Sequence, residues 1–530
     1  MLKRYKYILS VILITIMVSL LTACGGSENI VKKADLTIIS GSENKTLEPI
    51  IKEFEKINNV SIDMKYMGSV DIKLQLQEKN IPCDAVWPAN SLWISMGDVN
   101  HVVKYQKSIM TSPVVFGIRK SLAEKLGFTN RKVSVKDIQK AILDKKLSFM
   151  MTSATQSNSG ASAYLGFLYA ILGNPETISS GDLKSPKLKT QITQLLSGIN
   201  RSSGSSDWLK DLFLKGKYDA MVNYESLIIE TNQQLIKQGK EPLYAVYPYD
   251  GLVIADSPLG YINKGDSKKE DIYKKLQDYL LSEKIQNKIL DLGRRTGFGG
   301  VVTNADPKVF NTDWGIDTNK VLSPIKLPSS DVIEESLNLY QTQFKKPSYT
   351  IFCLDFSGSM SGNGESQVKT AMKTILDQDT AKKYMLQSTA QDVITVIPFS
   401  DNIFNVLSVK GNDKNKLERL NNQISELHAN GGTDIYSPAI RGLSEVAKIN
   451  LDNYIPSVII MTDGKSNVGK TFKDLESIYK NLGKDIPIFS IIFGDASEDQ
   501  LNEITNLTRG SVFDGKTDLI NAFKKVRGYN

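Results

Sequence analysis

A set of oxygen-bearing side chains in the C-terminal third has the types and spacing needed to hold a hard metal ion. Residues 355–359 read Asp-Phe-Ser-Gly-Ser, so the carboxylate of Asp355 and the hydroxyls of Ser357 and Ser359 fall at alternate positions. Thr433 follows two glycines, and Asp463 follows a run of mostly apolar residues. Oxygen ligands alone suit Mg²⁺ or Mn²⁺, which prefer octahedral oxygen coordination. The sequence therefore predicts a site for one of these ions.

The elements that carry these residues predict a parallel α/β sheet. Strand-like apolar runs, separated by amphipathic helical stretches, recur at 349–354, 393–397, 458–462 and 488–493. This alternation is typical of a doubly wound sheet, which binds ligands in loops at the carboxyl ends of its strands. Asp355 and Asp463 each come just after such a run. An Asp-x-Ser-x-Ser segment alone can be an ordinary turn, but the order of the three segments favours a metal site.

Together the three segments resemble the metal-ion-dependent adhesion site of von Willebrand factor A domains, with no ligand position substituted. The resemblance implies a doubly wound, Rossmann-like A domain over residues 347–530. It also implies that Ser357, Ser359 and Thr433 bind the metal directly, that the two Asp residues bind directly or through water, and that an Asp or Glu of a protein partner completes the shell. A metal-assisted hydrolase is disfavoured, because no general base or second metal-ligand cluster accompanies the site. The domain is predicted to be a binding module rather than an enzyme.

The N-terminus predicts export and lipid anchoring. A basic segment at 3–6 precedes an apolar run at 8–21, and residues 21–24, Leu-Thr-Ala-Cys, resemble a bacterial lipobox. The apolar run is shorter than the roughly 20 residues of a membrane span, which favours a signal peptide over a spanning helix. An ordinary cleaved signal is the other alternative. We predict a lipoprotein signal peptide at 1–23, lipidation of Cys24, and a flexible tether at 24–34.

Composition narrows the function classes. The chain has 530 residues, enough for about three lobes or domains. Its net charge of +7 falls to +4 once the three basic residues of the leader are removed, which is too modest to predict nucleic-acid binding. Only 10 of the 65 basic residues are Arg, which suggests a Gram-positive host, and two His make histidine-based zinc chemistry improbable. Cys83 and Cys353 fall in different predicted domains, so a disulfide between them is not expected.

The segment after the tether predicts a second α/β domain. A strand at 35–40, a helix at 47–58, a strand at 60–64 and a further strand-like run at 83–87 follow one another. This order, directly after a lipobox, resembles the extracellular solute-binding proteins of ABC importers. The resemblance implies a bilobed fold like that of type II periplasmic binding proteins over residues 35–310, with a ligand cleft between two α/β lobes. Residues 311–346, with a probable helix, are predicted to link it to the A domain.

Polar residues at predicted strand ends are the candidate ligands of that cleft. The polar stretch 152–160 precedes an apolar helix at 164–172, and a helix N-terminus offers free N–H groups to an anion. N-capping in a surface loop explains any single hydroxyl there equally well. Glu225 argues against a simple oxyanion, because a buried carboxylate would repel it, and the ligand class stays open. The candidate residues are Ser42, Asn90, Ser112, Thr155, Ser157, Ser159, Tyr224 and Glu225.

The two domains together predict a protein that acts by binding other molecules at the outer face of the cytoplasmic membrane. In the leading interpretation, the A domain captures a protein partner through Mg²⁺ or Mn²⁺, and the N-terminal domain recognises a small polar solute. The alternative is the substrate-binding component of an ABC importer whose A domain docks or scaffolds the complex. Neighbouring permease and ATPase genes would favour this alternative.

Overall fold

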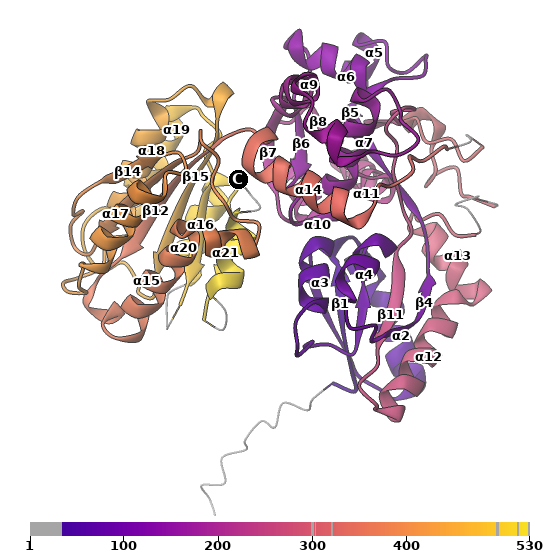
Figure 1. Cartoon of the computed structure of the whole chain (residues 1–530), viewed down its shortest axis with the longest axis horizontal. Helices are drawn as coiled ribbons and strands as arrows, with labels where there is room; N and C mark the ends of the chain where they lie inside the picture. The colour runs from indigo at the N-terminus through magenta and orange to yellow at the C-terminus, as the bar shows by residue number, and fades with distance from the viewer. Residues whose placement is uncertain are drawn as a thin grey trace, which may run out of the picture.

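The computed structural model describes residues 34–297, 302, 304–319, 322–493, 498–516 and 519–527. They form two lobes followed by a C-terminal domain, each built around its own sheet (Figure 1). Cys24, the expected leader and the tether up to residue 33 lie outside the described residues. Within the described part of the chain, no helix has both the length and the apolar character to cross a bilayer.

Lobe 1 has a five-stranded sheet in the order β2-β1-β3-β11-β4. β1 pairs in parallel with β2 and β3, while β11 returns antiparallel from much later in the chain. The strands are β1 (Leu36–Gly41), β2 (Ile62–Met67), β3 (Ala85–Trp87), β4 (Val103–Ser108) and β11 (Pro258–Ile262). The helices are η1 (Ser42–Leu47), α2 (Glu48–Asn58), α3 (Ser69–Leu76), α4 (Ser91–Gly97), α12 (Ser267–Leu281) and α13 (Glu283–Asp291).

Lobe 2 has a six-stranded sheet in the order β10-β5-β8-β6-β7, with β9 also paired to β5. Its long buried helix α7 lies in the lobe's hydrophobic core. The strands are β5 (Ser112–Arg119), β6 (Phe149–Thr152), β7 (Ile199–Ser203), β8 (Ala220–Tyr224), β9 (Leu243–Val246) and β10 (Ile254–Ala255). The helices are α5 (Lys120–Lys125), α6 (Val135–Leu143), α7 (Asn158–Ile171), α8 (Ser180–Leu183), α9 (Pro186–Leu196), α10 (Ser206–Lys215) and α11 (Glu225–Lys237).

The segment expected to be a linker packs against the lobes. Val309, Phe310, Trp314 and Ile316, around η3 (Thr312–Trp314), are buried in a lobe 2 core. α14 (Ser330–Leu339) and the π-helical η4 (Tyr340–Phe344) add apolar side chains to the other lobe 2 core. Glu334 of α14 also forms an ion pair with the buried Lys73 of lobe 1. The predicted helix is present, and it works as a brace across both lobes.

The A domain has a six-stranded sheet in the order β14-β13-β12-β15-β16-β17, parallel except for the edge strand β14. The strands are β12 (Ser348–Asp355), β13 (Val393–Phe399), β14 (Leu407–Lys410), β15 (Ile455–Thr462), β16 (Ile488–Ile492) and β17 (Val512–Asp514). The helices are η5 (Gly358–Met360), α15 (Asn363–Leu376), α16 (Gln378–Lys383), α17 (Lys414–Ser425), α18 (Tyr436–Ala447), η6 (Leu451–Asn453), α19 (Phe472–Leu482), α20 (Glu498–Thr508) and α21 (Leu519–Arg527). Apolar clusters lie on both faces of the sheet. The predicted α/β fold class, a bilobed type II domain followed by a doubly wound domain, is confirmed.

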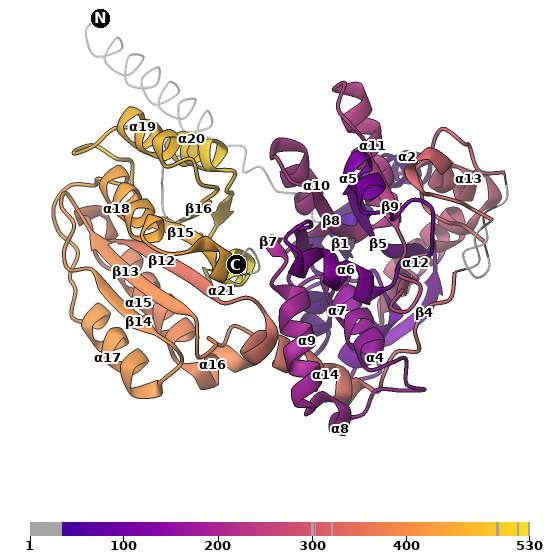
Figure 2. The same ribbon diagram turned by 90° about the horizontal axis from the view of Figure 1, so that it is seen from above.

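Lobe 2 contacts the A domain at the edge of its sheet where the parallel strands begin (Figure 2). Arg201 of β7, almost fully buried, lies 3.3 Å from Asp485 and donates to the carbonyl of Arg509 at 2.8 Å. Tyr218 donates to the same Asp485 at 2.6 Å. Asp485 and Arg509 precede β16 and β17, so the contact lies opposite the edge where those strands end. The carboxyl ends of the strands therefore face away from this contact.

Candidate functional site

The predicted metal-binding residues lie in three loops at one edge of the A-domain sheet. Asp355 is the last residue of β12, and Asp463 directly follows β15. These strands are parallel neighbours in which Leu354 pairs with Met461, so both carboxylates lie at the same edge. Thr433 lies in the loop that leads into α18. This is the edge at which doubly wound sheets bind ligands.

The side chains of these loops meet through oxygen atoms. Ser359 donates to Oδ1 of Asp463 at 2.9 Å, and the hydroxyls of Ser357 and Ser359 lie 3.2 Å apart. A Cβ atom placed on Gly464 would lie 3.2 Å from Oγ1 of Thr433 and 3.3 Å from Oγ of Ser359. The hydroxyls of Thr433 and Ser359 therefore flank the same glycine. Four of the predicted ligands thus lie in one cluster.

Asp355 is the buried carboxylate of this cluster. Its Oδ1 accepts a hydrogen bond from the N–H of Ser357 at 2.8 Å, and its Oδ2 accepts one from the hydroxyl of Thr462 at 2.5 Å. Burial, and to a smaller extent the neighbouring Asp463, raises the pKa of Asp355. No ion pair among the described residues includes Asp355, so neutral groups are its partners there.

The donor set fits a hard divalent cation. Two carboxylates and three hydroxyls offer oxygen only, which suits Mg²⁺ or Mn²⁺. In the described part of the chain, no group of three or more His, Cys, Asp and Glu residues is placed to hold a metal. Any metal at this edge of the sheet would therefore depend on the hydroxyls as well as on the two Asp residues.

Backbone hydrogen bonds hold the loops in place. The N–H of Gly358 donates to the carbonyl of Gly431 at 3.0 Å, which joins the first loop to the second. The N–H of Thr433 donates to Oδ1 of Asn467 at 3.0 Å, which joins the second loop to the third. Gly431 has a φ of 76°, in the left-handed region that favours glycine. The loops are thus fixed before any ligand arrives.

A second candidate site lies between the lobes of the N-terminal domain. It is a small pocket of about 20 Å³, lined in part by two predicted ligand residues, Ser112 and Tyr224. Such a volume accommodates about one water-sized group. The remaining lining residues come from both lobes and from the segments between them: Glu43, Ala89, Met110, Thr111, Ser226, Ala255, Ser257 and Arg294.

Predicted hydroxyls gather beside this cavity, where the N-termini of α7 and α10 meet. Ser159 lies 2.8 Å from the hydroxyl of Ser206, and Ser157 lies 3.1 Å from it. Asn158 donates to the hydroxyl of Tyr224 at 3.0 Å, which connects the cluster to the cavity wall. Ser42 of lobe 1 accepts a hydrogen bond from the hydroxyl of Ser205 of lobe 2 at 2.9 Å, so the cluster includes residues of both lobes.

The three remaining predicted ligand residues, like Ser42, Ser157 and Ser159, are absent from the cavity lining, and they have other partners. Asn90 caps α4 by accepting from the N–H of Leu92 at 2.9 Å. Thr155 lies near the brace, with Oγ1 3.5 Å from Oε1 of Gln341. Both oxygens of Glu225 accept hydrogen bonds from Arg295 at 2.8 Å, so this carboxylate is compensated within the protein. Glu225 therefore gives no information about the charge of the ligand, and it does not argue against an oxyanion.

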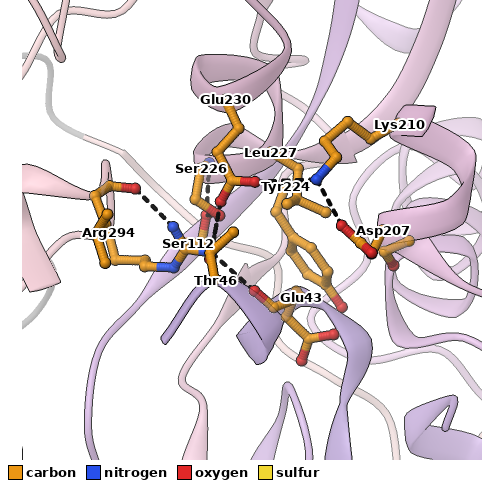
Figure 3. Close-up of polar contacts among 12 residues, drawn as sticks. Glu43, Thr46, Ser112, Asp207, Lys210, Tyr224, Ser226, Leu227, Glu230 and Arg294 are labelled. Atoms are coloured by element: carbon orange, nitrogen blue, oxygen red, sulfur yellow. Dashed lines mark hydrogen bonds and ion pairs between the residues drawn. The ribbon is translucent and has the colours of Figure 1, made fainter. Parts of the chain in front are cut away.

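A network of charged residues that the sequence analysis missed includes two residues of the cavity lining, Glu43 and Arg294 (Figure 3). Arg294 lies 2.8 Å from Glu230 of lobe 2 and donates to the backbone carbonyl of Glu43 of lobe 1 at 2.8 Å. Lys210 bridges Asp207 at 2.6 Å and Glu230 at 3.3 Å. Apart from the Lys210–Asp207 pair within α10, these contacts join different elements, so sequence spacing gives no signal for them. Only Glu43 lies directly beside a predicted ligand residue, Ser42, and could have been proposed from the sequence.

Glu43 differs from the other acidic residues of the cleft. Its side chain is buried, and its Oε1 has no hydrogen-bond partner. Burial raises its pKa to about 7. A Cβ atom placed on Gly41 would lie 2.1 Å from this Oε1, so the carboxyl group packs directly over a glycine.

Comparison with known proteins identifies both domains. Residues 36–295 match the bacterial extracellular solute-binding protein family, and residues 351–521 match the von Willebrand factor type A domain. The chain thus carries a solute-binding domain followed by a von Willebrand factor A domain, two kinds of domain that typically act in binding or adhesion.

Individual relatives cover only parts of the chain. The human inter-alpha-trypsin inhibitor heavy chain H6 is 31% identical over 160 residues, which is 28% of this chain and 11% of that protein. The chain thus spans about a tenth of that relative's length. The periplasmic binding protein AfuA from Actinobacillus pleuropneumoniae, solved with fructose-6-phosphate, is 14% identical with a TM-score of 0.45, covering 59% of this chain and 99% of that one. A von Willebrand factor type A structure from Catenulispora acidiphila is 20% identical with a TM-score of 0.28, covering 35% and 43%.

Proposed function

We propose that this protein is a lipid-anchored recognition protein whose A domain captures a protein partner through a divalent metal. The observation that carries this proposal is the cluster of oxygen ligands at the carboxyl edge of the A-domain sheet. We assign Asp355, Ser357, Ser359, Thr433 and Asp463 to the metal. Mg²⁺ or Mn²⁺ bound there would supply a Lewis-acidic position for an Asp or Glu of the partner.

The protein's own groups set how strongly such a partner is attracted. Asp355 is oriented by Ser357 and Thr462, so its carboxylate is held before binding begins. Ser357, Ser359 and Thr433 are neutral, so two Asp residues balance the ion and little negative charge is present to repel an incoming carboxylate. Because lobe 2 contacts the opposite edge of the sheet, the solute-binding domain does not cover this cluster.

The N-terminal domain has a separate role in this proposal. A small pocket lies between its two lobes, and its lining includes Glu43, Arg294 and several hydroxyl residues among apolar ones, which supports recognition of a small solute with a polar group. Lipidation of Cys24 would hold both domains at the outer face of the cytoplasmic membrane of a Gram-positive host. A pocket between two lobes also fits the alternative function, delivery of a solute to an ABC permease with the A domain as a docking module.

A capture experiment tests the leading proposal. The full-length protein, immobilised on beads, is incubated with surface proteins released from its own host in Mg²⁺, in Mn²⁺ and in excess EDTA. Capture of a defined protein that is lost in EDTA and restored by Mg²⁺ would support metal-dependent recognition. Capture that is equal in EDTA would assign recognition to another surface. Solute uptake that fails when the gene is deleted, with no such capture, would favour the transport alternative.

A further inference from the structure

The lining of the interlobe cavity includes a buried acidic residue, Glu43, that has no ion-pair partner among the described residues. Four carboxylates lie in or around the cavity, those of Glu43, Asp207, Glu225 and Glu230. Arg295 pairs with Glu225, Arg294 with Glu230, and Lys210 with both Asp207 and Glu230. Lys45 also approaches Asp207, at 3.9 Å, with its side chain 59% exposed. No ion pair among the described residues includes Glu43.

The cavity also presents unused hydrogen-bond acceptors. Oε1 of Glu43 and Oγ1 of Thr111 are both buried without a hydrogen-bond partner, and both residues line the cavity. Ser112 and Ser226, whose hydroxyls lie 3.4 Å apart, line it as well. Buried polar atoms are normally paired, so two unpaired oxygens on residues that line one small cavity point to a ligand that donates hydrogen bonds.

The positive groups nearby are already engaged. The guanidinium group of Arg294 donates to the carbonyls of Leu292 and Glu43 and to Thr46, and it pairs with Glu230. An oxyanion in the cavity would meet the carboxylate of Glu43 and would have to compete with Glu230 for this arginine. A divalent metal is disfavoured too, because one carboxylate supplies too little charge to dehydrate it.

From these contacts we infer that the cleft recognises a compact primary ammonium group, with Glu43 as its anionic partner. This inference rests on the proposed solute-binding role of the cleft and names the class of solute. An ammonium group donates several hydrogen bonds, which suits the acceptors Glu43 Oε1 and Thr111 Oγ1. The pocket of about 20 Å³ holds a group of that size.

The test measures thermal unfolding of the full-length protein above pH 7, where Glu43 with its pKa of about 7 is ionised. Ammonium and methylammonium chloride are compared with potassium chloride, sodium phosphate and sodium sulfate at matched ionic strength. A saturable rise in the unfolding temperature with the two amines alone is the expected result. An equal rise with potassium would overturn the role of hydrogen-bond donation.

Two variants separate the role of Glu43 from general effects on the fold. Glu43→Gln should weaken amine binding at least about tenfold, because a charged hydrogen bond is lost. Glu53→Gln is the matched control, since Glu53 pairs with Lys288 on α13 and is absent from the cavity lining. Gly41→Ala keeps the charge but forces the Glu43 carboxyl to move, so it should also weaken binding if Glu43→Gln does not fold.

The outcomes separate the ammonium inference from the solute-binding role on which it rests. Stabilisation by phosphate or sulfate but not by amines would overturn the ammonium assignment and leave solute binding intact. Amine binding that is unchanged in both Glu43→Gln and Gly41→Ala would overturn the role of Glu43. No shift with amines, anions, sugars, amino acids or peptides would overturn both the ammonium assignment and the solute-binding role.

Discussion

The edge of the A-domain sheet and the cleft between the lobes both bury carboxylates, but they compensate them differently. At the A-domain edge, Asp355 is held by a backbone N–H and a neutral hydroxyl. In the cleft, Glu225 and Glu230 are neutralised by Arg295 and Arg294. Glu43 is the exception in the cleft. A site that relies on neutral partners keeps its charge available for a cation, whereas a site built from ion pairs uses most of its charge to hold the lobes together.

The largest expected effect is at the A-domain edge. Asp355→Ala should abolish Mn²⁺ binding, because it removes charge from a site otherwise built largely from neutral hydroxyls. Loss of a partner that only orients a ligand costs 10- to 100-fold in metal affinity, so loss of a charged ligand should cost more than about 100-fold. Thr433→Ala should be milder for the metal but harmful to partner capture. Calorimetric titration of the full-length protein with Mn²⁺ measures the first effect.

The control for that prediction is Asp379→Ala, which changes an exposed carboxylate paired with Lys414. It should leave Mn²⁺ affinity unchanged. Equal Mn²⁺ affinity in wild type and in Asp355→Ala would assign any bound metal to other residues and remove the contrast between the two regions.

The difference between the regions also explains what could be predicted from the sequence. The strand expected at 458–462 is the end of β15 (Ile455–Thr462), and the two Asp ligands lie at the end of their strands or one residue beyond. The order of residues along the chain is therefore enough to predict that these two ligands lie at the same edge of the sheet. Glu225 meets Arg295 seventy positions later, and Thr155 lies near Gln341 of the brace. Such partners depend on how the lobes close, which local sequence pattern does not record.

A second prediction concerns the ion pairs of the cleft. Glu225→Ala should lower the free energy of unfolding by about 3–5 kcal/mol, because it leaves Arg295 buried without its partner. Lys414→Ala is the matched test of an exposed pair and should change the unfolding free energy far less, because solvent screens this pair. Urea unfolding followed by circular dichroism measures both. Similar small changes in the two variants would show that the cleft pair contributes no more than a surface pair.

A third prediction uses the pKa of Glu43, which burial raises from 4.5 to about 7 while Arg294 opposes the shift and Asp207 adds to it. A raised pKa in the folded state stabilises the fold fully below pH 4.5, and this contribution is lost as the pH rises through about 7. Glu43→Gln mimics the protonated acid at every pH. Without ligand, the variant should therefore match wild type in acid and exceed its stability above pH 7, by on the order of 3 kcal/mol.

Comparing Glu43→Gln with wild type at each pH removes the contribution of other acids to the pH dependence of stability. One such acid is Asp137, whose pKa is lowered by Arg131 and Ser134. Chemical denaturation at several pH values between 4 and 8 gives the difference in unfolding free energy. A constant difference across that range would mean that Glu43 titrates normally and that its carboxyl group is hydrated.

The smallest expected effect tests whether the two regions are independent. Glu334→Gln removes the charge partner of the buried Lys73 in lobe 1. Because Glu334 is 39% exposed, whereas Glu225 and Arg295 are both buried, the unfolding free energy should fall by less than in Glu225→Ala. The brace reaches the A domain through Gln341, which donates to the carbonyl of Gln387 at 2.7 Å. Gln387 precedes β13, so this contact lies at the edge of the sheet opposite the metal ligands. Mn²⁺ affinity should therefore stay the same in this variant, and a change in that affinity would show that closure of the lobes is transmitted through the sheet to the metal ligands.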